Sequence, residues 1–256
     1  MSGRRPQLEV VADAATAAAR AAELIAARVV AGRARVLGLA TGGTMVPLYA
    51  HLVAAVRAGR LSLSAVTSFN LDEYVGVAPQ MPASFHAYMR LHLLDEADLD
   101  PARAHVPDGM APDLTAEASR YEMAITRAGG IDLQVLGIGA NGHIGFNEPG
   151  SDFGSRTRVL ELSEATRRAN AADFPDGAVP ERALTMGIAT ILEAREIVLL
   201  AIGAKKAAAI AAAIEGPLSP NCPASALRLH AQVRIICDKA AASQLDGPQA
   251  DIRRQA

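Results

Sequence analysis

The chain has 256 residues, of which 50% are apolar, and its formal net charge at pH 7 is −2. This size and composition suit one large domain with a sizeable hydrophobic core. The near balance of charge argues against a protein whose main task is to bind nucleic acid or an anionic membrane surface.

Helical and strand patterns alternate along the sequence. An alanine-rich helix is predicted over residues 12–31, ending near Gly32. The apolar run 35–40 predicts a strand, which leads through Thr-Gly-Gly-Thr into a helix over 45–58. Further elements are expected as strands at 65–71, 131–137, 197–202 and 233–237, and as helices at 84–94, 115–128 and from the Gly-Ala-Lys-Lys turn to Glu215.

Short apolar strands between longer helices indicate βαβ units. We therefore expect an α/β fold with a mostly parallel sheet and helices on both faces. No linker or internal repeat divides the sequence, which predicts a single domain over 1–256. The least regular stretch, 145–180, is rich in Gly, Ser, Arg and Pro and suits a mobile lid, roughly 150–185, over a site.

The sequence predicts a cytoplasmic protein. It has no run of about 20 apolar residues that could span a membrane. Its N-terminus turns polar before any apolar run of signal-peptide type can form. Its two cysteines, Cys222 and Cys237, lie far apart and are expected to be reduced thiols.

Four unusual segments each come just after a predicted strand. They are the Thr-Gly-Gly-Thr turn at 41–44, the tripeptide at 72–74, the glycine-rich loop at 139–149 and the turn at 203–206. Ligands of open α/β sheets bind at the carboxyl ends of the strands, so we expect the four segments to meet in one crevice.

The turn formed by Thr41, Gly42, Gly43 and Thr44 suits an anion. Its glycines allow a sharp turn that brings N–H groups close to a ligand, and the following helix adds the positive end of its dipole. Lys206, at the start of another strand-to-helix turn, would complete a phosphate site. The alternatives are an ordinary glycine turn and a solvated lysine.

Acid–base groups follow two other strands. Asp72 would be placed at a strand end for proton abstraction, with a helix cap or a surface acid as the alternative. His143 lies between glycines, and Glu148 follows it just before a proline. A histidine with a carboxylate partner is a common proton-transfer pair.

Three other kinds of site fit the sequence poorly. A metal site would use Asp72, His143 and Glu148, but it lacks a second nearby His or a Cys. Dinucleotide binding would require G-x-G-x-x-G after the first strand, where the sequence has Thr-Gly-Gly-Thr. A serine hydrolase would require an elbow motif, which Ser155 lacks.

Five segments carry a resemblance to a known family. They are ATGGT (40–44), FNLDEYVG (69–76), GIGANGHIGFNEPG (137–150), SRTR (155–158) and GAKKAAAI (203–210). In order and in spacing they resemble the glucosamine-6-phosphate deaminase family, over roughly residues 10–240. The resemblance implies a modified Rossmann-like fold and an enzyme of amino-sugar catabolism that hydrolyses and isomerises glucosamine 6-phosphate to fructose 6-phosphate and ammonia.

The resemblance also implies roles for single residues. Asp72 is the expected base that moves a proton from C2 to C1 of the open-chain sugar. His143, assisted by Glu148 and Asn141, is the expected group that opens the pyranose ring. No metal or organic cofactor is implied, because the substrate's own amine acts as the electron sink. The expected site for the substrate phosphate consists of Thr41, Gly42, Gly43, Thr44, Arg167 and Lys206.

Three alternatives to this function stay open. The 6-phosphogluconolactonases share the fold and a related Gly-His loop, but they lack FNEP and tend to carry Arg where this chain has Tyr74. A galactosamine-6-phosphate deaminase would differ in contacts to the C4 hydroxyl. Sugar-phosphate sensor domains of transcription regulators carry a helix-turn-helix extension, for which the sequence has no room before its first helix.

Regulation is the last expectation from the resemblance. Some family members are hexamers activated by N-acetylglucosamine 6-phosphate, which binds just after the FNEP loop. Ser151 and Arg158 match that site, but Leu160 replaces its phosphate-binding lysine and Glu161 replaces a neutral residue. We expect hyperbolic kinetics without activation, in a protein that is either a monomer or a homo-oligomer.

Overall fold

The computed structural model describes residues 5–174 and 177–246. The predicted domain 1–256 thus extends over residues 1–4 and 247–256, which lie outside the described residues. The predicted lid likewise includes 175–176, which are also outside them.

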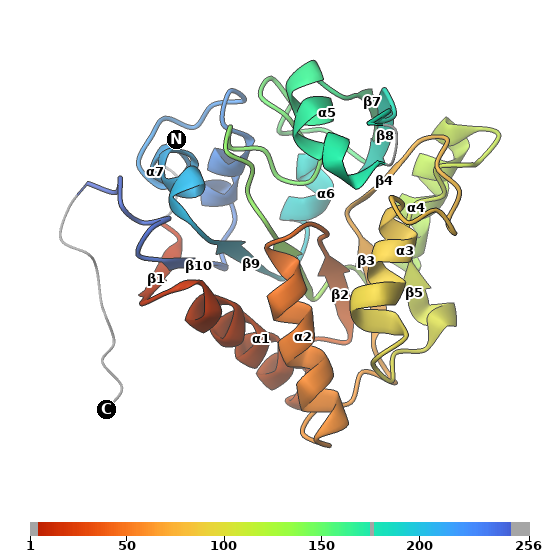
Figure 1. The fold of residues 1–256 in the computed structure, drawn as a ribbon, viewed down its shortest axis with the longest axis horizontal. Helices are drawn as coiled ribbons and strands as arrows, with labels where there is room; N and C mark the ends of the chain where they lie inside the picture. Colours follow the sequence, from red (N-terminus) through yellow and green to blue (C-terminus); the bar gives the residue numbers. More distant parts are fainter. Residues whose placement is uncertain (1–4, 175–176, 247–256) are drawn as a thin grey trace.

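A seven-stranded sheet crosses the centre of the molecule (Figure 1). All of its neighbouring strands are parallel. The middle strands β6 and β2 are buried at every residue, because helices cover both faces. In spatial order the strands are β1 (Gln7–Val11), β10 (Val233–Asp238), β9 (Glu196–Ala201), β6 (Leu133–Leu136), β2 (Val36–Leu39), β3 (Thr67–Asn70) and β5 (Ala104–His105).

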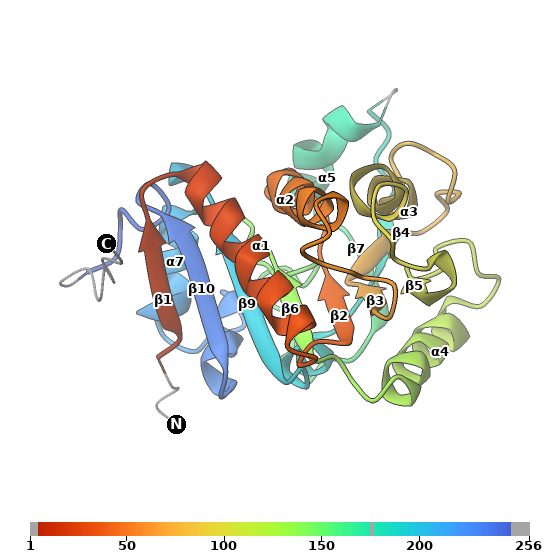
Figure 2. The same ribbon diagram turned by 90° about the horizontal axis from the view of Figure 1, so that it is seen from below.

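Helices α1 (Ala14–Val30) and α2 (Met45–Arg57) pack against each other on one face of this sheet. Helix α7 (Ala207–Ile214) lies across the sheet from α1 (Figures 1 and 2). The other α-helices are α3 (Phe85–Met89), α4 (Leu114–Arg127), α5 (Glu164–Asn170) and α6 (Ile188–Leu192). Segments of other helix types are the π-helical η1 (Arg90–Leu94) and the 3-10 helices η2 (Pro101–Arg103), η3 (Ala171–Asp173), η4 (Ala204–Lys206) and η5 (Pro223–Leu229).

A second sheet stands beside the first. It has three antiparallel strands, in the order β4 (Asp72–Tyr74), β8 (Arg182–Thr185) and β7 (Arg158–Glu161). With α3 and the glycine-rich loop it encloses a hydrophobic cluster separate from the main core, which we call the aromatic cluster. Its buried members are Tyr74, Val77, Ala83, Phe146, Leu162, Phe174, Val179 and Ala183.

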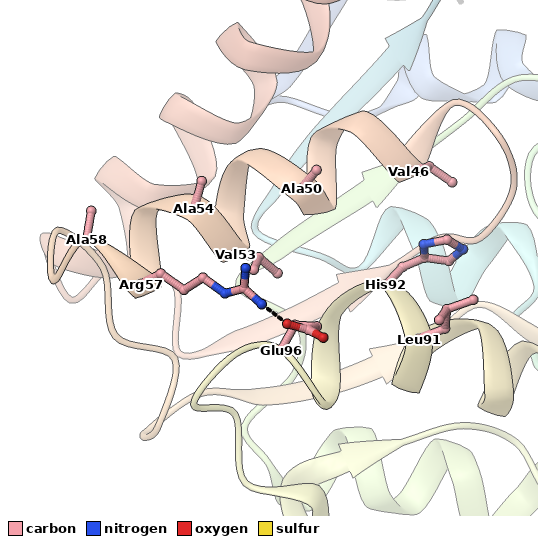
Figure 3. A pocket seen from close by; sticks show the side chains of 9 residues that line it. All are labelled: Val46, Ala50, Val53, Ala54, Arg57, Ala58, Leu91, His92 and Glu96. Atoms are coloured by element: carbon pink, nitrogen blue, oxygen red, sulfur yellow. Dashed lines mark hydrogen bonds and ion pairs between the residues drawn. The ribbon is translucent and has the colours of Figure 1, made fainter.

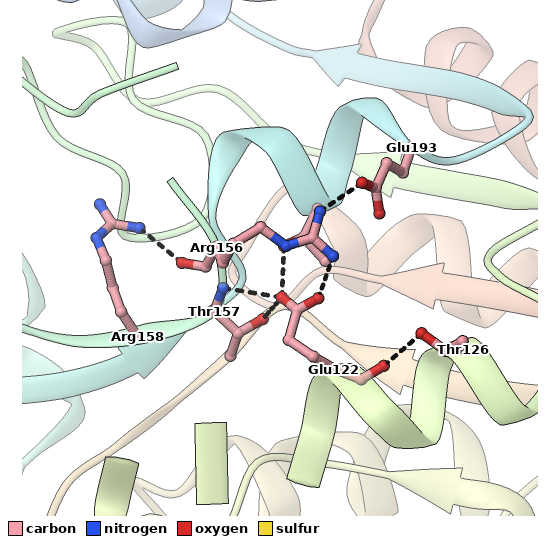
Figure 4. A network of polar contacts seen from close by, with 7 residues as sticks. Glu122, Thr126, Arg156, Thr157, Arg158 and Glu193 are labelled. Atoms are coloured by element: carbon pink, nitrogen blue, oxygen red, sulfur yellow. Dashed lines mark hydrogen bonds and ion pairs between the residues drawn. The ribbon is translucent and has the colours of Figure 1, made fainter. Parts of the chain in front are cut away.

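A polar network ties this second sheet to the rest of the molecule (Figure 4). Glu122 on α4 accepts hydrogen bonds from the backbone and the hydroxyl of Thr157, just before β7, and pairs with Arg156. The same carboxylate accepts a hydrogen bond from Thr190 on α6, which follows β8. Both ends of the β7–β8 segment are therefore fixed at α4.

The strands predicted for the parallel sheet are confirmed, apart from shifts at their ends. The predicted helix 84–94 is a continuous helical segment that divides into α3 and the π-helical turn η1. The tripeptide 72–74 follows β3 as predicted and is itself the strand β4. The stretch predicted to be irregular contains β7, α5 and β8, and its role as a lid stays a prediction.

Candidate active site

The Thr41-Gly42-Gly43-Thr44 turn joins the carboxyl end of β2 to Met45, the first residue of α2. Gly42 has φ +101°, a conformation that glycine adopts without a steric penalty. Among the described residues, the N–H groups of the four turn residues find no hydrogen-bond acceptor. Free amides at a helix N-terminus suit an anion, so the geometry agrees with the predicted role.

Asp72 is the first residue of β4 and is 5% exposed. Its Oδ2 lies 3.3 Å from the position that a Cβ on Gly145 would take, so the carboxyl sits against the glycine-rich loop. Burial, and after it the charge of Glu73, raises the pKa of Asp72 to about 8. A carboxyl with a pKa near neutrality can both accept and return a proton.

Glu73 has a different role from its neighbour. Its carboxylate accepts hydrogen bonds from the N–H groups of Phe85 and His86, each at 3.0 Å, and from that of Tyr74 at 2.8 Å. Phe85 and His86 form the first turn of α3. Glu73 therefore anchors α3 to the strand that carries Asp72.

His143 is held by its neighbours in the glycine-rich loop. A Cβ added at Gly139 would come within 2.3 Å of the imidazole, so the ring packs directly on this glycine. The N–H of His143 donates to Oδ1 of Asn141 at 3.2 Å. Burial lowers the pKa of His143, and the charge of Lys206 lowers it further, while Glu148 opposes the shift. His143, Lys206 and Glu148 therefore lie within electrostatic reach of one another.

The predicted His143–Glu148 pair is close but not directly bonded. Glu148 accepts a long hydrogen bond, 3.4 Å, from the N–H of Ser163. The Nδ1 atom of His143 is buried and has no hydrogen-bond partner among the residues described. The ring nitrogen is thus available to a ligand or to a shift of Glu148.

The two basic side chains that are predicted to bind the substrate phosphate lie in different surroundings. Lys206 is half-buried in η4, and burial lowers its pKa. Arg167 lies on α5, where a guanidinium nitrogen is 3.9 Å from Glu181 and Nε is buried without a partner in the described chain. The structure brings Lys206 to His143, but it records no contact from Arg167 to the anion-binding turn. The phosphate role of Arg167 stays a prediction.

A groove of about 760 Å³ runs along α2, and its lining does not include Asp72, His143, Glu148, Arg167 or Lys206 (Figure 3). It is lined by α2 and η1 side chains, among them Val46, Leu91 and His92. The described residues contain no group of three or more His, Cys, Asp or Glu side chains that could hold a metal ion. They also contain no helix long and apolar enough to cross a membrane.

Two residues near Asp72 had no predicted role. Thr185 on β8 is the register partner of Asp72, and its hydroxyl accepts a hydrogen bond from the N–H of Phe146 at 3.2 Å. Asn147 is fully buried and donates to the carbonyls of Ile144 and Met186. Asn147 lies in one of the segments that resemble the family, so the sequence could have indicated it. Thr185 lies close to Asp72 only through the pairing of β8 with β4, so no pattern in the nearby sequence indicates it.

The fold and the site are those of an α/β enzyme, in which the buried residues Asp72 and His143 and the turn 41–44 follow strands of the parallel sheet. Residues 9–236 match the family described as glucosamine-6-phosphate isomerases/6-phosphogluconolactonase. The chain is 54% identical over 242 residues to a glucosamine-6-phosphate deaminase of Rhodopirellula baltica, covering 94% of this chain and 96% of the relative. It is 49% identical over 227 residues to glucosamine-6-phosphate deaminase 2 of Bacillus subtilis, covering 88% and 91%.

Solved structures agree with this relationship. A monomeric glucosamine-6-phosphate deaminase superposes with a TM-score of 0.90 at 44% identity, covering 93% of this chain and 99% of the other. A 6-phosphogluconolactonase of Trypanosoma brucei, at 22% identity and a TM-score of 0.73, covers 95% and 100% and shares the fold. The chain belongs to the glucosamine-6-phosphate isomerase/6-phosphogluconolactonase family, and within it to the glucosamine-6-phosphate deaminases.

Proposed function

We propose that the protein converts glucosamine 6-phosphate to fructose 6-phosphate and ammonia. The observation that carries this proposal is the placement of Asp72, a buried carboxyl with a pKa of about 8, against the loop that holds His143. Relatives that are 49% and 54% identical, and that bear the name of this activity, support the choice of substrate.

Ring opening is assigned to His143. Its lowered pKa keeps the imidazole neutral, so it can accept the proton of the C1 hydroxyl and deliver it to the ring oxygen O5 as the C1–O5 bond breaks. Asn141 orients the backbone of His143, and Glu148 stabilises the protonated ring through its charge. The product is the open-chain aldehyde.

Isomerisation is assigned to Asp72. The ionised carboxylate removes the C2 proton, and the electron pair forms a C1–C2 double bond as O1 takes up a proton from water, which gives an enolamine. Asp72 then returns its proton to C1, and the C2 amine becomes an imine as it gives up one proton to the solvent. Water adds to C2 and ammonia leaves, which yields fructose 6-phosphate. One carboxyl serves both transfers because its raised pKa suits either protonation state.

The substrate phosphate is assigned to the free amides of the turn 41–44, to Lys206 and to Arg167. Amides at a helix N-terminus and a lysine make charge-assisted hydrogen bonds with a phosphate. Arg167 would have to exchange its contact with Glu181 for the phosphate, which the 3.9 Å separation of that pair makes inexpensive. The cytoplasmic location and the oligomeric state stay predictions.

The test is ammonia release from glucosamine 6-phosphate, measured beside galactosamine 6-phosphate and alongside hydrolysis of 6-phosphogluconolactone. We expect rapid ammonia release from the glucosamine substrate and little reaction with the other two. Preferential hydrolysis of the lactone, or faster release from the galactosamine epimer, would refute the proposed substrate.

A further inference from the structure

Two tyrosine hydroxyls hold the carbonyl groups of the anion-binding turn. Tyr49 on α2 donates to the carbonyl of Ala40, and Tyr88 on α3 donates to the carbonyl of Gly42 at 2.9 Å. The Gly42 carbonyl also accepts the N–H of Met45 at 2.9 Å. A carbonyl oxygen turned toward a bound anion would repel it, so these donors engage the backbone groups that an anion site must keep away.

The amides of the same turn show the opposite pattern. Among the described residues, the N–H groups of 41–44 have no acceptor, whereas the carbonyls of Ala40 and Gly42 are both engaged. The two peptide groups Ala40–Thr41 and Gly42–Gly43 thus have their carbonyls directed at the tyrosines, which directs the N–H groups of Thr41 and Gly43 the opposite way. Because Gly42 has no side chain to restrict its dihedral angles, the hydroxyl of Tyr88 helps the N–H of Met45 to hold this orientation.

The setting of Tyr88 suits a fixed contact. Its ring centroid lies 4.4 Å from that of His92 and 6.4 Å from that of Tyr49. Its helix, α3, is anchored at its first turn by Glu73, the neighbour of Asp72. A continuous set of contacts therefore runs from the strand that carries the base, through α3, to the turn.

We propose that Tyr88 is a positioning residue for the substrate phosphate, acting through the Gly42 carbonyl to keep the amides of the turn directed at the anion. The inference rests on the proposed function for the identity of the ligand. The same contact would orient the turn toward inorganic phosphate, which therefore serves as an independent probe. Tyr49 has the same task at Ala40, but it is fully buried and also belongs to the core.

The experiment compares wild type with Tyr88→Phe, which removes one hydroxyl and keeps the ring. We expect KM for glucosamine 6-phosphate and the dissociation constant of inorganic phosphate, measured by calorimetry, to rise in parallel by about 3- to 10-fold, the effect of one hydrogen bond. We expect kcat to change by less than about twofold, since the hydroxyl does not touch the reacting carbons. A general loss of stability would not produce this split between KM and kcat.

Two further variants test whether the hydroxyl is responsible. His92→Ala removes the ring that packs on Tyr88 but no donor to the turn, so it should weaken phosphate binding less than Tyr88→Phe does. Tyr49→Phe should weaken phosphate binding as Tyr88→Phe does, with a lower melting temperature because its site is buried. Equal phosphate affinity in wild type and Tyr88→Phe would overturn the inference and leave the proposed function intact. Normal phosphate binding without ammonia release would instead refute the proposed function, and the affinity comparison would still decide the role of Tyr88.

Discussion

The two sheets of this protein contribute different parts of the site. The parallel sheet ends in the anion-binding turn and in η4 with Lys206, and an extensive core of buried aliphatic side chains supports it. The antiparallel sheet contributes Asp72 and rests on the much smaller aromatic cluster. Regions with fewer buried contacts open more easily, so we expect the turn 41–44 and Lys206 to lie on the firmer part and Asp72 on the more adaptable one.

The aromatic cluster also explains how the antiparallel sheet keeps its shape. The ring of Tyr74 lies 4.8 to 5.4 Å from the rings of Phe85, Phe146 and Phe174, separations at which aromatic pairs attract. The Tyr74 hydroxyl accepts a hydrogen bond from Asn170 at the end of α5, at 3.0 Å. The strand of the base is thereby linked to the helix that carries Arg167.

The largest expected effect is a loss of turnover, without a loss of substrate affinity, on substitution of Asp72. Asp72→Asn should lower kcat by roughly 10²- to 10⁴-fold, the value of a positioned general base, because the amide cannot accept the C2 proton. Substrate affinity should be preserved, since Asp72 is assigned no contact with the substrate phosphate. Steady-state kinetics together with calorimetric binding would check both points. A variant with near-normal turnover would remove Asp72 from the mechanism.

The next largest effect is expected from the two basic side chains assigned to the substrate phosphate, Lys206 and Arg167. Lys206→Ala and Arg167→Ala should each weaken substrate binding by about 1.5–3 kcal/mol, or about 10- to 100-fold in KM, because each removes a hydrogen bond to a charged group. Their matched controls are the neighbouring Lys205→Ala and Arg168→Ala, both at exposed side chains. A strong effect of Lys206 alone would mean that α5 does not reach the phosphate.

The pH dependence of kcat/KM should reflect the burial of Asp72 on the antiparallel strand β4. Asp72 must be ionised to act as a base, so kcat/KM should rise as the pH is raised through about 8. Because the pKa of this carboxyl is raised from 3.8, its burial favours folding below about pH 4. This contribution is lost as the pH rises through 8.

Glu73→Gln sharpens this prediction. The charge of Glu73 is the second cause of the raised pKa of Asp72, so its removal should move the rise in kcat/KM to lower pH. The exposed Glu164→Gln is the control and should leave the pH profile in place. An unchanged profile in Glu73→Gln would show that burial alone sets the pKa of Asp72.

The smallest expected effect concerns N-acetylglucosamine 6-phosphate, which should leave the kinetics hyperbolic and unchanged. Arg158, which matches the effector site of hexameric family members, donates to Asn147 at 2.9 Å and to Ser151 at 3.4 Å. Leu160 packs beside the aromatic cluster, where it offers no charge to a phosphate.

Substrate titrations with and without millimolar effector test this expectation, and size-exclusion chromatography gives the oligomeric state. Sigmoidal kinetics that become hyperbolic with effector would show that an altered site still functions. Such coupling would require a differential affinity of about 1–3 kcal/mol between two states of the protein.

The sequence by itself determined the parallel sheet and the approximate position of the site. Its strands are short, apolar and bounded by glycine turns, and a buried parallel strand carries that pattern locally. The anion-binding turn could be found for the same reason, since its glycines and the helix after them are adjacent in sequence. The placement of His143 in a glycine-rich loop was likewise visible in the sequence.

Only the tertiary structure decided how the remaining groups are used. Strands β1 and β4 pair with β10 and β8, which lie far along the chain, and no local pattern marked either of them. Asp72 and Glu73 are adjacent acids in the sequence. Pairing with β8 buries the first against the glycine-rich loop, and α3 engages the second. The hydroxyl of Tyr88 faces Gly42 because helix packing brings them together, and such long-range contacts leave no periodic signal in a sequence.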